Sequence, residues 1–219
     1  MRHFLLILLL CIFATPIFAA DGASTAARND STVQVGITPI GLSLPALSQP
    51  LALGFYLNDS LLLGVESGAF TVSLDSSDVT GNISYTNQGM FARWWVGNSF
   101  NLLGGYYQRE FSGTATANET IISGGQSVQA EATGSVTSKA SVVSLGLGNQ
   151  WQFNFGLVIG CDWAIYNQVL NHAYSSSITT NTGYANTSEA EQALADAEPA
   201  YKKLHQFPGL VHFYLGFAF

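Results

Sequence analysis

The chain has 219 residues, of which 47% are hydrophobic and only 10% are charged, and its formal net charge is −7. Soluble globular proteins carry roughly 25% charged residues, so this composition leaves few charges to cover a water-facing surface. The acidic balance disfavours nucleic acid as a partner, because phosphate binding needs clustered cations, and the length fits a single domain.

The first 20 residues have the pattern of a secretory signal peptide. Arg2 supplies the positive charge, an apolar run follows, and small residues at Ala19 and Ala20 form a cleavage site. The apolar run is shorter than the roughly 20 residues that a membrane-spanning helix needs. We therefore expect export with cleavage after Ala20, followed by a short periplasmic tail at 21–31. Cleavage leaves Cys161 as the only cysteine, which excludes an internal disulfide.

Most of the remaining chain alternates between apolar and polar or small residues, as β-strands do. Turns that contain Asn lie between two apolar runs in three similar segments, 55–64, 94–105 and 146–156. The intervening segments are polar and variable in length. Together these patterns predict eight strands, near 32–40, 50–57, 60–73, 84–97, 100–112, 137–148, 151–166 and 208–219.

Short turns that alternate with long loops are typical of an outer-membrane barrel with periplasmic turns and external loops. A soluble lipocalin-like barrel also has eight strands. The predicted strand 151–166 favours the membrane, because its face with Gly156, Gly160 and Ala164 suits a narrow lumen better than a soluble core. We expect an all-β fold, a closed antiparallel transmembrane β-barrel of eight strands over 32–219, with external loops near 74–83, 113–136 and 167–207.

Large aromatic residues are expected where the barrel meets the lipid headgroups. In the predicted strand 151–166, Trp151 and Trp163 lie on the apolar face about a dozen residues apart, as two girdles of aromatics would. We predict that Trp94, Trp151 and Trp163 are interfacial residues.

The end of the sequence, "HFYLGFAF", continues the apolar alternation to Phe219. In this feature the chain resembles the small outer-membrane β-barrel proteins of Gram-negative bacteria, the porin-like and OmpA/OmpX/OmpW-like group. The resemblance implies that the last strand is read by the barrel assembly machinery, and His212 matches the polar position usual in that signal. A glycine is usual two residues later, where this chain has Tyr214. The matching apolar row comprises Val211, Phe213, Leu215, Phe217 and Phe219.

Four charged residues fall inside predicted strands: Glu66, Arg93, Arg109 and Asp162. An Arg on the lipid face would cost roughly 2–4 kcal/mol at mid-membrane, so we expect these side chains in the lumen, with the register of Arg109 ambiguous. They could form a constriction that selects permeants. They could also form a paired network that fills the lumen, because an eight-stranded barrel is barely wide enough for its own side chains.

Some small outer-membrane barrels are enzymes that modify lipid A with Ser and His. Here His172 lies beside Ser175 in a loop rich in Ser and Thr, without a recognisable deacylase motif. Segment 188–209 is the only helical candidate, with a capping box at Ser188 and a break or kink expected at Pro199. A hairpin around Gly124–Gly125 is expected to rise above the membrane, either as an adhesive edge or as a variable loop.

The sequence thus predicts an integral outer-membrane barrel with a structural, surface-interaction or small-solute pore role. The alternatives are a lipid A deacylase-like enzyme and a soluble lipocalin-like ligand-binding barrel. We expect no enzymatic activity, no cofactor and no metal. Expected partners are outer-membrane lipid and lipopolysaccharide, the barrel assembly machinery and periplasmic chaperones during biogenesis, and an extracellular ligand that the sequence does not name.

Overall fold

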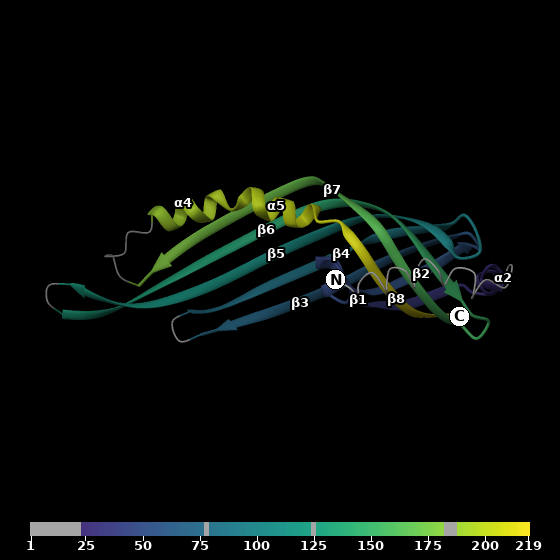
Figure 1. Ribbon diagram of the computed structural model, residues 1–219, viewed down its shortest axis with the longest axis horizontal. Helices are drawn as coiled ribbons and strands as arrows, with labels where there is room; N and C mark the ends of the chain where they lie inside the picture. Colours follow the sequence, from purple (N-terminus) through teal and green to yellow (C-terminus); the bar gives the residue numbers. More distant parts are fainter. Residues whose placement is uncertain (1–22, 77–78, 124–125, 182–187) are drawn as a thin grey trace, which may run out of the picture.

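The computed structural model describes residues 23–76, 79–123, 126–181 and 188–219. The predicted signal peptide and the hairpin tip at Gly124–Gly125 lie outside the described residues. Eight strands form one antiparallel sheet in sequence order, and the sheet closes on itself (Figure 1). The strands are β1 (Val33–Gly41), β2 (Leu51–Asn58), β3 (Leu61–Asp75), β4 (Val79–Trp95), β5 (Phe100–Ser123), β6 (Gln126–Gln152), β7 (Leu157–Thr180) and β8 (Gly209–Ala218).

The barrel closes where β1 meets β8. Gln34 pairs with Ala218, and the ladder continues to the pairing of Gly41 with His212. Beyond β8, the backbone carbonyl of Phe219 accepts hydrogen bonds from the N–H groups of Thr32 and Val33, each at 2.9 Å. A closed ring leaves no open sheet edge where backbone groups would meet lipid unpaired. The predicted closed eight-stranded barrel is confirmed.

The two ends of the barrel differ. At one end, here called the turn end, short turns occupy 59–60, 96–99 and 153–156, and the end of β8 lies beside them (Figure 1). We call the opposite end the loop end. The strands reach it to very different extents, because β1, β2 and β8 have 9, 8 and 10 residues, whereas β5, β6 and β7 have 24, 27 and 24. The sheet of β3–β7 therefore continues beyond the closed ring, and we call this part the sheet extension.

The sheet extension accounts for most of the segments expected as loops. Much of 74–83 and 113–136 is strand in the β3–β4 and β5–β6 hairpins, and β7 continues to Thr180 before the helices begin. Their Ser-, Thr- and Gly-rich sequence resembles a loop because both faces are polar. The strands form because each segment is paired along its length with a neighbour, as in the ladder from Phe100↔Asn149 to Ser123↔Gln126.

The β6–β7 turn lies later than the sequence predicted. The predicted strand 151–166 is wrong at its start, because Trp151 is the second-last residue of β6 and pairs with Ile159 of β7. The turn forms at Gly156, which has φ +96°, a conformation that residues with a Cβ rarely adopt. A hydrogen bond from the N–H of Phe153 to the carbonyl of Leu157 (2.9 Å) closes this turn.

The outer surface is an apolar band. Side chains on the outward register are exposed along neighbouring strands, among them Leu53, Phe55, Leu63, Val65, Met90, Leu145, Ile159, Leu215 and Phe217. An irregularity in β7 at Ala164, with φ +55°, shifts the alternation. As a result Tyr166 is exposed and Ile165 is buried.

In the described part of the chain, four helices flank the strands: α2 (Ala23–Asn29), α3 (Leu44–Leu47), α4 (Ser188–Asp196) and α5 (Glu198–Gln206). The first lies at the turn end, within the predicted tail, and neither it nor α3 was predicted. The predicted helix at 188–209 is present as α4 and α5, divided just before Pro199 as expected. Both lie along β6 and β7 at the loop end (Figure 1). No helix in the described part of the chain is long and apolar enough to cross a bilayer.

Candidate functional site

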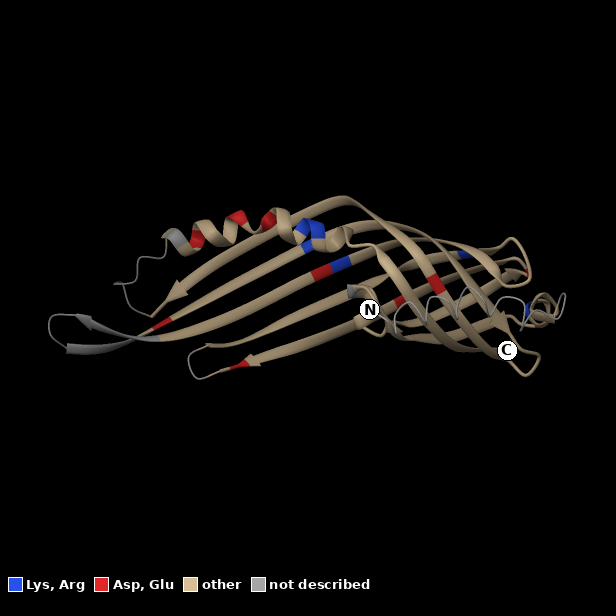
Figure 2. Ribbon diagram, viewed as in Figure 1, with Lys and Arg blue, Asp and Glu red and all other residues tan. Residues whose placement is uncertain are grey.

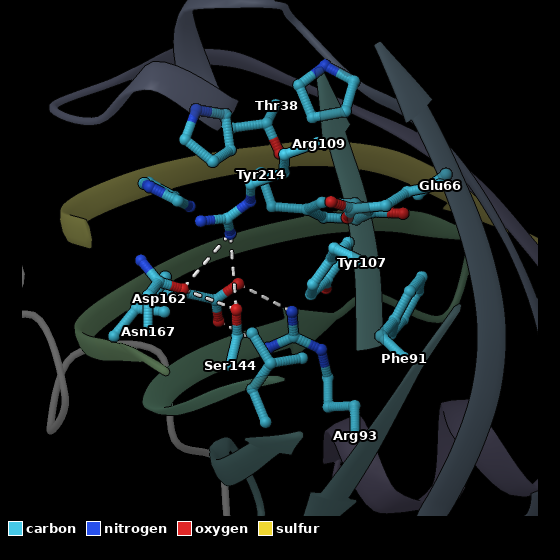
Figure 3. Close-up of a pocket in the computed structure, with 16 residues that line it drawn as sticks. Thr38, Glu66, Phe91, Arg93, Tyr107, Arg109, Ser144, Asp162, Asn167 and Tyr214 are labelled. Atoms are coloured by element: carbon cyan, nitrogen blue, oxygen red, sulfur yellow. Dashed lines mark hydrogen bonds and ion pairs between the residues drawn. The ribbon is translucent and has the colours of Figure 1, made fainter. Parts of the chain in front are cut away.

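The lumen is filled by side chains, from α2 at the turn end to α5 at the loop end. Most are polar, and an apolar and aromatic cluster that includes Leu62, Phe91 and Trp95 lies among them. A small cavity of about 40 Å³ lies in the middle, lined by Glu66, Arg93, Arg109 and Asp162 among others (Figure 3). A cavity needs about 10–15 Å³ to hold one water molecule, so this one has room for a few waters. The structure places all four predicted lumen charges around it.

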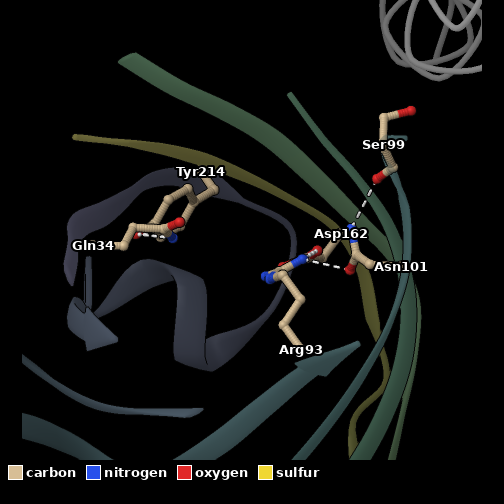
Figure 4. Close-up of polar contacts among 6 residues, drawn as sticks. All are labelled: Gln34, Arg93, Ser99, Asn101, Asp162 and Tyr214. Carbon is tan, nitrogen blue, oxygen red and sulfur yellow. Dashed lines mark hydrogen bonds and ion pairs between the residues drawn. The ribbon is translucent and has the colours of Figure 1, made fainter. Parts of the chain in front are cut away.

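The central contact of the lumen is an ion pair between Arg93 of β4 and Asp162 of β7. Nη1 lies 2.6 Å from Oδ1 and Nη2 lies 2.7 Å from Oδ2, so the pair is bidentate, and both residues are buried (Figure 4). Nη1 also donates to Oδ1 of Asn101 at 2.6 Å. Since β4 and β7 are not neighbours in the ring, the pair spans the lumen.

Arg109 of β5 forms a second layer nearer the loop end, and the structure resolves its register as inward. Its Nε donates to Oδ1 of Asn87 at 3.2 Å, and Asn87 donates to Oε1 of Glu66 at 3.0 Å. The Nη2 of Arg109 lies 3.2 Å from Oδ1 of Asn167 and Nη1 lies 2.9 Å from the carbonyl of His205 in α5. Through these contacts Arg109 connects β4, β5 and β7 to α5, the helix that covers them.

The loop end of the lumen is covered by α5. His205 is buried against β6, where the hydroxyl of Ser138 lies 3.0 Å from Nε2 of His205 and 3.0 Å from Nε2 of His172. Burial, with His172 and Arg109 nearby, lowers the pKa of His205 from 6.5 to about 4. Nδ1 of His172 lies 3.6 Å from Oε1 of Glu198.

The enzyme alternative depended on His172 acting with Ser175. Ser175 is exposed, and His172 instead contacts Ser138. Ser138 has no exposed surface beneath α5. A nucleophile needs access to its substrate as well as a base, so this arrangement lacks the access that an acyl-transfer site requires.

The turn end of the lumen is covered by α2 through Arg28. Its Nε donates to the carbonyl of Asp59 at 2.6 Å and its Nη1 to the carbonyl of Asn98 at 2.8 Å, while Cζ lies 4.6 Å from the ring centroid of Trp95. Burial lowers the pKa of Arg28 to about 10. One side chain therefore ties α2 to two of the three short turns.

Several lumen residues at the turn end were not singled out from the sequence. Gln34 donates to the Tyr214 hydroxyl at 2.9 Å (Figure 4). Tyr56 contacts both Gln34 and Gln152, and Gln152 donates to the carbonyl of Ala27 in α2 at 2.9 Å. Tyr214 takes the place of the glycine usual in the assembly signal, and Gly36 of β1 leaves space for its ring. These lumen residues could have been found in the sequence from their polar character at inward-facing positions of the strands.

The predicted interfacial aromatics divide into two groups. Trp94 is exposed on the outer surface, and Trp163 is half-buried, with its ring centroid 6.3 Å from that of Phe100. Trp151 is buried at the end of β6, so its expected exposure to lipid headgroups is wrong.

The predicted assembly row keeps its outward register over most of β8. Leu215, Phe217 and Phe219 are exposed, and Phe213 is half-buried. Val211 is buried opposite Trp163, so the exposed part of the row begins at Leu215. His212 faces inward, lines the lumen cavity and contacts the hydroxyl of Ser43.

No protein-family model and no curated protein matches the sequence. Among solved structures, CarO2 of Acinetobacter baumannii aligns with a TM-score of 0.50 at 14% identity, over 86% of this chain and 98% of that one. The chain has the fold of the small outer-membrane β-barrels. CarO of the same species (TM-score 0.48, 12% identity, 86% and 98% covered) and Ail, the attachment invasion locus protein of Yersinia pestis (0.44, 12%, 86% and 97%), are also similar.

Proposed function

We propose that this protein is an integral outer-membrane barrel whose lumen is closed and whose sheet extension is a binding surface outside the cell. The observation that carries the proposal is the contrast between the two parts. The lumen is blocked by the buried Arg93–Asp162 pair and covered at both ends, whereas the extension is polar and largely accessible.

The apolar outer band supports the membrane location. Its exposed Leu, Val, Phe and Met side chains surround the ring. Exposing so large an apolar surface to water would be unfavourable, whereas lipid would cover it. The strands of the ring have at least the length that crosses a bilayer when tilted, about 9–11 residues, except β2 with 8.

The sheet extension supports the surface role. Within the described residues, 118–123 of β5 and 126–130 of β6 pair in the sheet only with each other, because the β4–β5 ladder ends at Ala117 and the β6–β7 ladder begins at Ala132. A strand with one free edge can add a strand from a partner. This role requires no enzymatic activity and no pore.

Cysteine labelling tests the orientation. The mature chain contains Cys161 alone, which is buried, so background labelling is low. We expect Asp75→Cys, at the loop end, to react with a membrane-impermeant maleimide on intact cells. Asn154→Cys, in an exposed turn at the opposite end, should react only after the outer membrane is permeabilised. The reverse pattern would contradict the proposed orientation.

Two further measurements test closure and the surface role. In planar bilayers we expect no conductance steps from the refolded protein, and steps in the wild-type protein would contradict a closed lumen. Replacing 118–131 by Asn-Gly joins the paired residues Ala117 and Ala132 through a tight turn and shortens the extension. We expect the shortened protein to insert normally, but cells that express it should no longer adhere. Unchanged adhesion would show that this hairpin is not the binding surface.

A further inference from the structure

An apolar groove lies on the outside of the barrel, at the loop end of the seam between β1 and β8. Its volume is about 420 Å³, within the range of about 300–1,000 Å³ usual for small-ligand sites. The lining comes from the end of β1, α3, α5 and the start of β8, and comprises Gly41, Leu42, Ser43, Leu47, Leu204, Phe207 and Leu210. Leu47 and Phe207 are 58% and 50% exposed.

The groove continues the surface that faces lipid. Below it along the same seam, Ile40 pairs with Phe213 and Val35 with Phe217, and these side chains are exposed or half-buried on the outward register. The β8 strand has 10 residues, about the number that crosses the apolar part of a bilayer. The groove at its loop end therefore lies where acyl chains meet headgroups.

Cations lie beside the groove in an otherwise acidic protein. Of the Lys and Arg residues that the structure describes, the three arginines are buried and Lys139 pairs with Glu110 at 3.1 Å. Lys202 and Lys203 of α5 are exposed and have no ion pair with a described residue (Figure 2). Phe207 is the C-cap of α5 and follows Lys203 by four residues, about one helical turn. Lys203 therefore lies on the side of α5 that leads to Phe207, whereas Lys202 lies on another face.

We propose that this groove binds a phosphorylated, acylated glycolipid of the outer leaflet, the lipid A part of lipopolysaccharide. One acyl chain lies against Leu204, Phe207 and Leu210, and a phosphate contacts the ammonium group of Lys203. The inference rests on the proposed function, because the loop end must face the outer leaflet.

Native mass spectrometry of the refolded mature chain in detergent tests this site, with purified diphosphoryl lipid A as the probe. We expect one lipid A to remain bound. The Lys203→Ala variant should bind about tenfold more weakly, because it loses the charge-assisted hydrogen bond to the phosphate. Phe207→Ser should also lose binding.

Matched controls separate the groove from general lipid contact. Lys202→Ala removes an equal charge from the same helix, and Leu170→Ser removes an exposed apolar side chain from β7. Both should bind lipid A as the wild type does. If Lys203→Ala and Phe207→Ser bind normally, the site is wrong; if phosphatidylglycerol with the same acyl length binds equally well, the assignment to a glycolipid is wrong.

Heat-modifiable migration in detergent gels, recorded for every variant, distinguishes the two proposals. A wild-type protein that shows no difference between unheated and boiled samples would contradict the membrane barrel itself. A protein that shows the difference but binds no lipid A would overturn the groove alone.

Discussion

Arg93 and Asp162 meet across the lumen from strands that do not touch in the sheet, through two hydrogen bonds of 2.6 and 2.7 Å. The pair has two consequences. It holds opposite walls of the barrel together, and it occupies the space that a permeant would need. Replacing one partner leaves the other charge buried and uncompensated.

We expect Arg93→Met to lower the free energy of unfolding by about 3–5 kcal/mol, the usual cost of breaking a buried ion pair. Urea unfolding of the protein in lipid vesicles measures the change. Lys139→Met is the control, because it removes an exposed ion pair with Glu110 and should cost about 1 kcal/mol or less. Equal losses in the two variants would show that the buried pair has no special role.

Arg28 is expected to hold α2 against the turn end. Arg28→Met retains much of the apolar stem and removes the donors to Asp59 and Asn98, so two buried carbonyl contacts are lost. We expect faster proteolysis or amide hydrogen exchange within 23–29, with the barrel strands still protected. Asn29→Ala, which changes an exposed residue of the same helix, is the matched control. Unchanged exchange in Arg28→Met would contradict this role.

Gly156→Ala should destabilise the β6–β7 turn for two reasons. The backbone has φ +96°, and an added Cβ would lie 2.5 Å from the carbonyl oxygen of Ala218. We expect a loss of about 1–3 kcal/mol, typical of a strained backbone conformation, seen as slower folding and earlier unfolding in urea. Gly97→Ala is the control, since an added Cβ there meets no atom within 4 Å. If both variants behave alike, the strain at Gly156 is not important.

The docking of α5 should weaken in acid through His205. Its pKa is about 4 in the folded protein and 6.5 in an exposed histidine, so the undocked state binds more protons between these values. Docking is therefore fully stable above about pH 6.5 and loses up to about 1.4 kcal/mol per pH unit as the pH falls toward 4. Hydrogen exchange of 198–206 measures this loss. His205→Gln should flatten the pH dependence, and an unchanged profile would contradict the assignment.

Removing Phe219 should reduce assembly into the membrane while export continues. The backbone of Phe219 makes three hydrogen bonds with Thr32 and Val33, and its ring ends the outward row of β8. We expect the deletion to lower the heat-modifiable fraction more than Phe219→Ala, which keeps the backbone bonds. Leu57→Ala removes an apolar side chain of similar exposure from β2 and controls for lost lipid contact.

The strand number and the inward position of the charges could be predicted because both follow from period-two alternation. Pairing across the lumen could not: alternation places Arg93 and Asp162 inside but does not determine their relative heights, which depend on the stagger of all eight strands. The polar hairpins of the sheet extension resembled loops, because without a buried face they lack the apolar alternation by which strands are recognised. The seven residues of α2 are too few for a helical period, and its position depends on the contacts of Arg28.

The β6–β7 turn shows why local signals can mislead. Asn149 and Gln150 have turn-forming or polar character, yet both remain in the ladder with β7. The left-handed backbone at Gly156 determines the reversal instead, and this moved Trp151 to a different strand from Trp163. His172 was recognised as unusual, but its contact with Ser138 depends on a strand that begins at Gln126.

The seam between β1 and β8 also constrains the order of events during biogenesis. On one side β1 pairs with β2, which is close in sequence, and on the other side it pairs with β8, the last strand. Gln34 can therefore pair with Ala218 only after all the strands between them have been added to the sheet. Until then the incomplete sheet has two unpaired margins, each able to join another chain. We therefore expect a chain that is interrupted before β8 to keep both margins unpaired and to aggregate.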